Sequence, residues 1–438
     1  MLNKKKIYIK KNLNFRENQS KNFFKFINNK NLNYAVLGNL TSFPKKIKSD
    51  LDIFIDLKNH EQIKNLISNF AKKQHLNISN IIMYEYNCVA YELTKLVDGV
   101  VYNIIIDVCN YYTQQYRDFQ NLSILKKIKV KYKNTYYFKL IEKDNVYYYF
   151  SKKILKNEID KISYNYFKRR RFSLINNPKF SNREKKFILE IFNSKNFIKL
   201  KKNFSKLEKI IKSKGKIRLF KEIKRYLFRI KFPTGLDIAL LGVDGSGKTT
   251  QINFLLNGSV QKIFRGTKVF HLYNEQTISN TKKVIPYQKR YGIFLSFFKI
   301  MYLFLKYLFF NLSKISILKI KTKFILIDRN YYDVIIDPKR YGISYFKPLI
   351  NILFSVFLKP DLLIFLNPNP KIIYRRSKEL SKDILNKNIN LYNSFLREKN
   401  GITFINANYS PLKLSLKINR IIYSHINKKT KTIFDNLK

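Results

Sequence analysis

The chain has 438 residues, with 86 Lys and Arg against 29 Asp and Glu and a formal net charge of +57. Two or three domains are expected, because single hydrophobic cores seldom grow beyond about 250–300 residues. With 45% apolar residues, 12 Gly and 2 Cys, the composition excludes a wholly disordered, a collagen-like and a disulfide-stapled protein. The first residues, MLNKKKIYIKK, contain no apolar signal segment, so we expect a cytoplasmic protein with reduced thiols.

Lysine and asparagine are enriched together with Ile, Phe and Tyr, and Trp is absent. These enriched residues share AT-rich codons, so genomic base composition accounts for much of the positive charge without a polyanionic partner. A basic surface can still bind nucleic acid, because each Lys or Arg that neutralises a phosphate releases a counterion. Charge alone therefore does not predict a nucleic-acid partner, and a nucleic-acid-binding ATPase is the least favoured of our hypotheses.

Short apolar strands are predicted in the first region of the chain, which we assign to residues 1–116. Strands are expected at 34–38, 51–55 and 102–108, with a helix near 59–73. This mixture predicts a small α+β domain.

The rest of the chain divides near residue 232. Residues 117–232 are rich in Lys with helical spacing, and we interpret them as a helical spacer or accessory region. In residues 233–438, apolar strands such as 324–328 and 362–366 alternate with helices. That order predicts an α/β domain with a parallel sheet flanked by helices.

One segment, residues 293–318, is apolar enough to raise the question of a membrane span. Lys299, Lys306 and Lys314 interrupt it seven or eight residues apart. A span needs about 20 residues with few or no charges, so an amphipathic helix packed on a domain core fits better. We predict no membrane span.

The strongest motif is DIALLGVDGSGKTTQINFLL at 237–256, in which an apolar strand enters a glycine loop and a helix leaves it. Glycines let successive backbone N–H groups face phosphate oxygens, and the helix contributes the positive end of its dipole. Lys248 is expected to reach the β- and γ-phosphates, and the Thr249 hydroxyl to hold Mg²⁺. The predicted ATP-binding residues are Gly242, Gly245, Ser246, Gly247, Lys248, Thr249 and Thr250.

The sequence GVDGSGKTTQ resembles the phosphate loop of the thymidylate kinase family, which carries an acidic residue at the position of Asp244. About 80 residues later, an apolar strand ends in Asp328-Arg329, similar to the Asp-Arg-Tyr motif of that family. The segment PDLLIFLNPNPKIIYRRSKEL resembles its later core strand and the lid that bears Arg375 and Arg376. Together these motifs cover about 200 residues in the order that the family shows.

The resemblance implies a role for each matched residue. Asp244 would accept a hydrogen bond from an acceptor sugar hydroxyl, and Arg329 would pair with the acceptor phosphate. Asp328 would lie near Mg²⁺ and its waters. Arg375 and Arg376 would close over the transferring phosphoryl group, where a planar guanidinium can stabilise the spreading charge.

The chain departs from the family where the acceptor would bind. It has VFHLYNEQ at 269–276 in place of an Arg-Glu-Pro segment, which leaves His271 as a candidate acceptor residue. Asp333, Asp337 and Arg340 are candidates for lining a different acceptor pocket. The acceptor is therefore left open between a nucleotide and a phosphorylated or free sugar.

Two carboxylates in the first region, Asp50 and Asp52, are spaced to lie on one face of a strand. Asp107 ends the later apolar strand YNIIID. Neighbouring carboxylates repel unless a cation lies between them, so the three acids are candidate Mg²⁺ ligands for two-metal chemistry. Asp56 continues the alternation, which keeps open the alternative of an edge strand with an acidic solvent face.

A glycine turn, the Asp-x-Asp pair and the later Asp resemble the nucleotidyltransferase superfamily related to DNA polymerase β. Asn39 stands where that pattern has a second Gly or Ser. The resemblance covers about 90 residues and implies a nucleotidyltransferase-like fold.

Our leading hypothesis is an ATP- and Mg²⁺-dependent kinase that passes the γ-phosphoryl group to a small nucleotide or sugar-phosphate acceptor. The main alternative is nucleotide transfer by the three aspartates of the first region. A homodimer is left open, and the sequence identifies neither the acceptor nor the role of residues 117–232.

Overall fold

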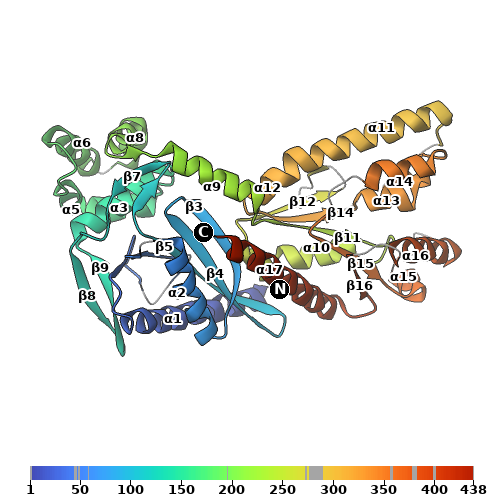
Figure 1. Ribbon diagram of the computed structural model, residues 1–438, viewed down its shortest axis with the longest axis horizontal. Helices are drawn as coiled ribbons and strands as arrows, with labels where there is room; N and C mark the ends of the chain where they lie inside the picture. Colours follow the sequence, from blue (N-terminus) through green and yellow to red (C-terminus); the bar gives the residue numbers. More distant parts are fainter. Residues whose placement is uncertain are drawn as a thin grey trace. The chain divides into compact units, whose positions relative to one another are not determined.

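Two units share the chain and exchange short segments of sequence. The computed structural model describes residues 2–43, 47, 50–57, 59–194, 196–271, 274–275, 290–355, 359–376, 382–397 and 401–437. Unit 1 comprises residues 1–95, 102–231 and 430–438, and unit 2 comprises residues 96–101 and 232–429 (Figure 1).

A seven-stranded mixed sheet forms the centre of unit 1, in the order β3-β4-β5-β2-β1-β9-β8. The pairs β2–β5 and β1–β9 are parallel, whereas β1–β2, β3–β4 and β8–β9 are antiparallel. The strands are β1 (Tyr34–Val36), β2 (Asp50–Ile55), β3 (Asn77–Glu85), β4 (Cys88–Val97), β5 (Val100–Cys109), β8 (Lys127–Tyr132) and β9 (Thr135–Leu140).

The period-two pattern of β2 divides its side chains between two cores. Leu51, Ile53 and Ile55 pack against α1 (Leu2–Asn28) and α2 (His60–Lys73). The opposite face, which carries Phe54, packs against helices that come after the sheet in sequence. These are α3 (Glu142–Leu155), α4 (Lys161–Arg169), α5 (Arg171–Ile175), α6 (Asn182–Asn193), α7 (Phe197–Lys202) and α8 (Phe204–Ser213).

The predicted helical region 117–232 begins with strands, and this part of the prediction is wrong. β8 and β9 join the main sheet of unit 1 as an antiparallel hairpin. β7 (Arg117–Gln120) lies in a small sheet with β6 (Tyr112–Gln114) and β10 (Lys216–Ile217). Lysines alternate with apolar or aromatic residues in KIKVKY, which suits a strand with one solvent-facing side. Helices begin at residue 142, and the last of them, α9 (Leu219–Lys231), leads to unit 2.

Unit 2 contains the predicted parallel sheet flanked by helices. Its strand order is β13-β12-β14-β11-β15-β16, with only the short β13 antiparallel to its neighbour. The first strand in sequence, β11, therefore lies between β14 and β15. The strands are β11 (Leu236–Leu241), β12 (Thr267–His271), β13 (Asn274–Glu275), β14 (Phe324–Asp328), β15 (Leu362–Asn367) and β16 (Ile402–Asn406).

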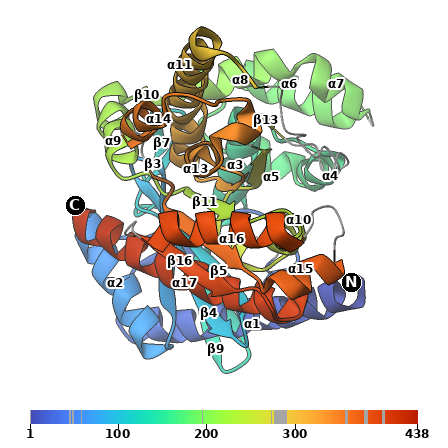
Figure 2. The same ribbon diagram turned by 90° about the vertical axis from the view of Figure 1, so that its right-hand side faces the viewer.

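Helices cover both faces of this sheet (Figure 2). Ile238 and Leu240 of β11 pack on the face covered by α10 (Lys248–Leu256) and α17 (Pro411–Asn436). The alternate residues Ala239 and Leu241 face the other core. That core includes α11 (Ile293–Phe309), α13 (Tyr331–Ile336), α14 (Lys347–Ser355), α15 (Pro370–Arg376) and α16 (Lys382–Arg397), with short turns η1 (Val260–Ile263) and η3 (Pro338–Tyr341) elsewhere in the unit.

The apolar segment near residue 300 is one continuous helical rod formed by α11, the π-helix η2 (Phe310–Ile315) and α12 (Ser316–Ile320). By length and composition, residues 293–320 could cross a membrane, with mean hydropathy 1.8 over their most apolar stretch. One face of the rod, with Ile300, Leu303 and Tyr307, packs into the core of unit 2, the packing that the sequence predicted.

Candidate active site

The glycine loop follows β11 at the carboxyl edge of the parallel sheet, beside the ends of β14 and β15. This is where the strand order reverses, the position at which open α/β sheets bind ligands. Gly242, Gly245 and Gly247 have φ of 151°, 80° and 92°, in the region that favours glycine. A Cβ on Gly242 would lie 2.7 Å from Ser246 Oγ, whereas one on Gly247 would meet nothing within 4 Å. The loop is thus closed at its base and open at the start of α10.

Lys248 is buried and bends back over the loop that precedes it. Its Nζ donates to Gly242 O at 2.7 Å and to Val243 O at 3.0 Å, and lies 4.0 Å from Asp244 Oδ1. Burial lowers the pKa of Lys248, and the charge of Arg329 lowers it further. Lys248 therefore holds a positive charge within the loop at some electrostatic cost, which an anion would relieve.

Two buried arginines hold the loop carboxylate Asp244 between them. Arg329 donates from Nη2 to Asp244 Oδ1, and Arg340 donates from Nη2 to Oδ2 at 2.7 Å. Burial alone would raise the pKa of Asp244, but the charges of Arg329, Lys248 and Arg340 outweigh burial and lower the pKa to about 2. Asp244 is therefore ionised at neutral pH, and three cations surround it.

Several buried polar atoms around this cluster have no hydrogen-bond partner within the described part of the chain. They are Ser246 Oγ, Asp328 Oδ1, Arg329 Nη1 and Arg340 Nε. A buried polar atom left unpaired costs about 1–3 kcal/mol, so this many at one sheet edge indicates a place built for a polar ligand. Asp328 ends β14 directly beside Leu240 of β11, and an unpartnered carboxylate oxygen there fits a cation.

The remaining predicted residues of unit 2 are distributed differently. Thr249 and Thr250 are exposed at the start of α10. His271 is the register partner of Asp328 on β12, and burial lowers its pKa. Arg375 is exposed on α15. The side chain of Arg376 lies outside the described residues.

Of the three candidate acceptor residues Asp333, Asp337 and Arg340, two stabilise short helices and one lies at the glycine loop. Asp333 accepts a hydrogen bond from Asn330 N at 2.9 Å and another from the Tyr392 hydroxyl, which fixes the start of α13. Asp337 caps η3. Arg340 alone reaches the loop. Its residue type and place made it an acceptor candidate, but the sequence carries no local signal for its pairing with Asp244, 96 residues earlier.

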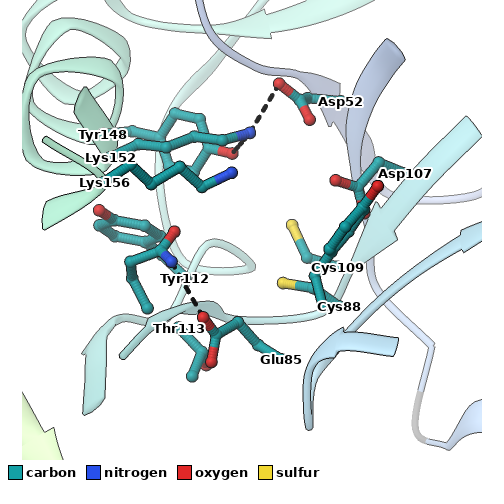
Figure 3. A pocket seen from close by; sticks show the side chains of 12 residues that line it. Asp52, Glu85, Cys88, Asp107, Cys109, Tyr112, Thr113, Tyr148, Lys152 and Lys156 are labelled. Carbon is teal, nitrogen blue, oxygen red and sulfur yellow. Dashed lines mark hydrogen bonds and ion pairs between the residues drawn. The ribbon is translucent and has the colours of Figure 1, made fainter. Parts of the chain in front are cut away.

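A second candidate site is the cavity of unit 1, of about 550 Å³ including its part open to solvent. Asp52 of β2 and Asp107 of β5 are register partners on adjacent parallel strands, and both line it. Lys152 and Lys156 of α3 lie across the cavity from them (Figure 3). The Nζ of Lys152 is 2.9 Å from Asp52 Oδ2.

The cavity moves the pKa values of Asp107 and Lys152 away from their ordinary values. Burial, followed by the charge of Asp52, raises the pKa of Asp107 to about 8. Burial would lower the pKa of Lys152, but the charge of Asp52 holds it well above its ordinary value. Lys152 thus stays charged beside Asp52, and Asp107 keeps its proton near neutral pH. One oxygen of Asp107 has no hydrogen-bond partner in the described part of the chain.

The glycine turn predicted beside these acids is held by Asn145 of α3. Gly38 N donates to Asn145 Oδ1 at 2.9 Å, and Asn145 Nδ2 donates to Gly38 O at 2.8 Å. Gly38 has φ 94°, and a Cβ there would lie 3.7 Å from Asp52 Oδ2. The turn therefore approaches the carboxylate closely.

Asp50 begins β2 but does not line the cavity. Across the described ranges, no three His, Cys, Asp or Glu side chains lie close enough together to hold a metal ion. Asp52 and Asp107 come together as the sequence predicted, while the three-carboxylate centre is not assembled. Cys88 and Cys109, both free thiols, complete the cavity wall next to Asp107 (Figure 3).

Comparison with known proteins gives structural neighbours only. No protein-family model and no curated protein matches the chain. A thymidylate kinase from Candida albicans is 17% identical over 44% of this chain and 93% of its own, with a TM-score of 0.31. A thymidylate kinase from Ehrlichia chaffeensis is 14% identical over 43% of this chain and 98% of its own, with a TM-score of 0.30. Likenesses of this size carry no argument about function, which has to be inferred from the chain's own residues.

Proposed function

We propose that unit 2 is a phosphotransferase that takes a phosphoryl group from a nucleoside triphosphate, with ATP as the expected donor. The observation that carries this proposal is the buried cluster of Lys248, Arg329 and Arg340 around Asp244 at the mouth of the glycine loop. The carboxylates of Asp328 and Asp333 act on the same cations, and Arg329 Nη1 and Arg340 Nε still have no hydrogen-bond partner among the described residues. Unpaired guanidinium N–H groups suit the oxygens of a polyphosphate.

The residues fit a bound triphosphate and Mg²⁺. The open space beside Gly247 and the unpartnered Ser246 hydroxyl suit phosphate oxygens at the start of α10. Asp328 and Thr249 are the residues that would hold Mg²⁺, which neutralises phosphate charge when bound. Lys248 would exchange its two loop carbonyls for phosphate oxygens.

Transfer would break the bond between the γ-phosphorus and its bridging oxygen, which leaves with the nucleoside diphosphate. A bond would form between the γ-phosphorus and an oxygen of the acceptor's phosphate, which carries no proton as a dianion. Lys248 and the arginines stabilise the charge that spreads over the transferring group. Arg329 is preset for this role, since its φ of 69° is uncommon for a non-glycine residue and is held by the ion pair with Asp244. The acceptor would bind on the side of the arginines, next to His271, and would be a nucleotide or a sugar phosphate.

The test is phosphoryl transfer from labelled ATP to a panel of nucleoside monophosphates and sugar phosphates. Lys248→Ala should reduce transfer by at least a hundredfold, because it removes the only cation inside the loop among the described residues. Lys371→Ala, which removes an exposed lysine of α15, is the matched control and should retain activity. Full transfer by Lys248→Ala would refute the proposal.

A second function is favoured by the register of Asp52 and Asp107 in unit 1. We infer nucleotidyl transfer as the alternative activity of the chain, with these two carboxylates as the Mg²⁺-binding pair. The unpartnered oxygen of Asp107 and the close approach of Gly38 to Asp52 support it. Lys152 and Lys156 would face the phosphates of the transferred nucleotide.

This alternative is separable from the first by variants in each unit. Asp52→Asn should abolish incorporation of labelled nucleotide into an acceptor while leaving phosphoryl transfer by unit 2 intact. Asp56→Asn, an exposed change on the same strand face, should leave both activities unchanged. Nucleotide incorporation that survives Asp52→Asn would exclude unit 1 as its source.

A further inference from the structure

The outer face of the α11 rod is apolar over its whole length. Side chains three or four residues apart, and hence on one side of a helix, project away from the core of unit 2. They are 45% to 82% exposed. We call this set the α11 ridge: Phe294, Phe298, Tyr302, Leu305, Phe309 and Leu312.

The ridge is distinct from the face that stabilises unit 2. Ile300, Leu303 and Tyr307 bury themselves against the sheet, so the helix is anchored without the ridge. Six large apolar side chains facing water on one helix are far more than the scattered exposed residues of an ordinary surface. Such a patch, with polar residues at its rim, marks a docking surface.

Lysines form the rim. Lys299 and Lys306 lie half-buried on one flank of the rod, and Lys314 is exposed further along. The Nζ of Lys306 is 3.2 Å from the Tyr302 hydroxyl, and the Nζ of Lys299 is 5.8 Å from the Tyr302 ring centroid. Both stems therefore run along apolar surface while their ammonium groups reach its edge, the arrangement by which lysines span an apolar–polar boundary.

The loop before α14 extends the same surface. The rings of Phe297 and Phe346 lie 6.1 Å apart, and Tyr345 and Phe346 are both exposed. Lys347 comes next and is exposed too. The patch thus combines aromatic residues with cations on two elements.

The positive charge around the α11 ridge indicates what kind of surface it can contact. Residues 276–327 contain no Asp or Glu, so the rim offers only positive charge. A second copy of the chain would bring lysine rims together with no carboxylate between them, and each copy carries a net charge of +57. An anionic lipid surface complements both features, because acyl chains accept the ridge and phosphate headgroups accept the lysines.

We propose that the α11 ridge docks unit 2 on the surface of an anionic lipid bilayer. The ridge enters the boundary between headgroups and acyl chains, and Lys299 and Lys306 lie at headgroup level. The rod stays packed on unit 2 and does not cross the bilayer. This inference is independent of the phosphotransferase proposal, since no ridge residue lies in the loop cluster.

The test is flotation of the full chain with vesicles of phosphatidylcholine alone or with one third phosphatidylglycerol. Binding is expected only to the anionic vesicles and should weaken as salt rises. The triple variant Phe294→Ser, Phe298→Ser, Leu305→Ser should lower binding at least tenfold. The matched control, Ile124→Ser, Ile162→Ser, Phe172→Ser, removes equally exposed side chains of unit 1 and should bind like the unchanged chain.

Circular dichroism and sedimentation velocity accompany each variant. Phe294→Ser alone removes a ring that is 82% exposed and should partly reduce vesicle binding. This single variant replaces the triple variant in the test if the triple variant misfolds. Equal binding by the ridge variant and the unchanged chain would overturn the proposal. Equal, salt-independent binding to neutral vesicles would also overturn it. A dimer that forms without lipid and is lost in the ridge variant would overturn it too, because the ridge would then be the contact with a second copy of the chain.

Discussion

Replacing Asp107 by Asn should remove a pH-dependent loss of stability from unit 1. In the folded chain, burial and the charge of Asp52 raise the pKa of Asp107 to about 8, whereas an unfolded Asp titrates near 3.9. Between about pH 4 and pH 8 the unfolded chain has released a proton that the folded chain keeps. The stability that this difference provides is present at low pH and is lost as pH rises through the folded pKa.

The size of the effect comes from the two pKa values. Each pH unit in this window costs about 1.4 kcal/mol, or on the order of 5 kcal/mol by pH 8. The cavity is partly open to water, which reduces the expected cost to a few kcal/mol. Asp107→Asn cannot ionise, so its stability relative to the unchanged chain should grow steadily from pH 5 to pH 8 and then level off.

Native-state hydrogen exchange localised to β2 and β5 is the assay, because the chain has no Trp to report on one unit by fluorescence. Protection factors, corrected for the intrinsic pH dependence of exchange, are compared between Asp107→Asn and the unchanged chain at pH 5 and pH 8. A constant difference at both pH values would mean that Asp107 ionises normally in its cavity, and the reasoning would be refuted. Mg²⁺ added at pH 8 should stabilise only the unchanged chain if Asp107 is a ligand.

Three further changes test other parts of the description. Asp244→Asn leaves two buried guanidinium groups without their carboxylate and should destabilise unit 2 by about 3–5 kcal/mol in urea unfolding. A double-mutant cycle with Arg340→Gln that shows no coupling energy would contradict the ion pair. Gly242→Ala forces a Cβ against Ser246 Oγ at φ 151° and should abolish binding of an ATP analogue in calorimetry, whereas Gly292→Ala, in open space, should bind normally. Asn145→Ala removes two buried hydrogen bonds to the glycine turn and should cost about 2–3 kcal/mol by chemical denaturation, with a cost near zero counting against that anchoring role.

Features set by neighbouring residues could be predicted from the sequence. The glycine loop, its strand and its helix are contiguous, so their geometry depends on local φ requirements. Asp328 and Arg329 come after an apolar strand, and parallel strands bring their carboxyl ends to one edge. The predicted meeting of Asp52 with Asp107 rests on the same logic, and the structure places them opposite each other.

Contacts between residues far apart in the chain could not be predicted from the sequence. Arg340 reaches Asp244 because η3 follows a short capped helix, a path that no periodicity encodes. Lys152 pairs with Asp52 from 100 residues away, a partner that the spacing of the aspartates does not indicate. Helix α1 was not predicted, because Lys and Asn make up 13 of its 27 residues and its buried Phe23 and Phe24 lie near its end.

Because each unit contains segments from distant parts of the chain, the two units cannot be separated by a single cut in the sequence. Four peptide bonds join the units, at 95–96, 101–102, 231–232 and 429–430. The sequence alone suggests dividing the chain at residue 232. That division removes two parts of unit 1, namely the Thr430 hydroxyl, which donates to Ser79 O at 2.9 Å, and the core residue Leu437. It also strips unit 2 of Val101, whose N–H donates to Ser259 Oγ at 2.8 Å. Either half expressed alone would expose apolar surface, so inactivity of a half is no evidence against its catalytic role, and point variants in the intact chain are the informative experiment.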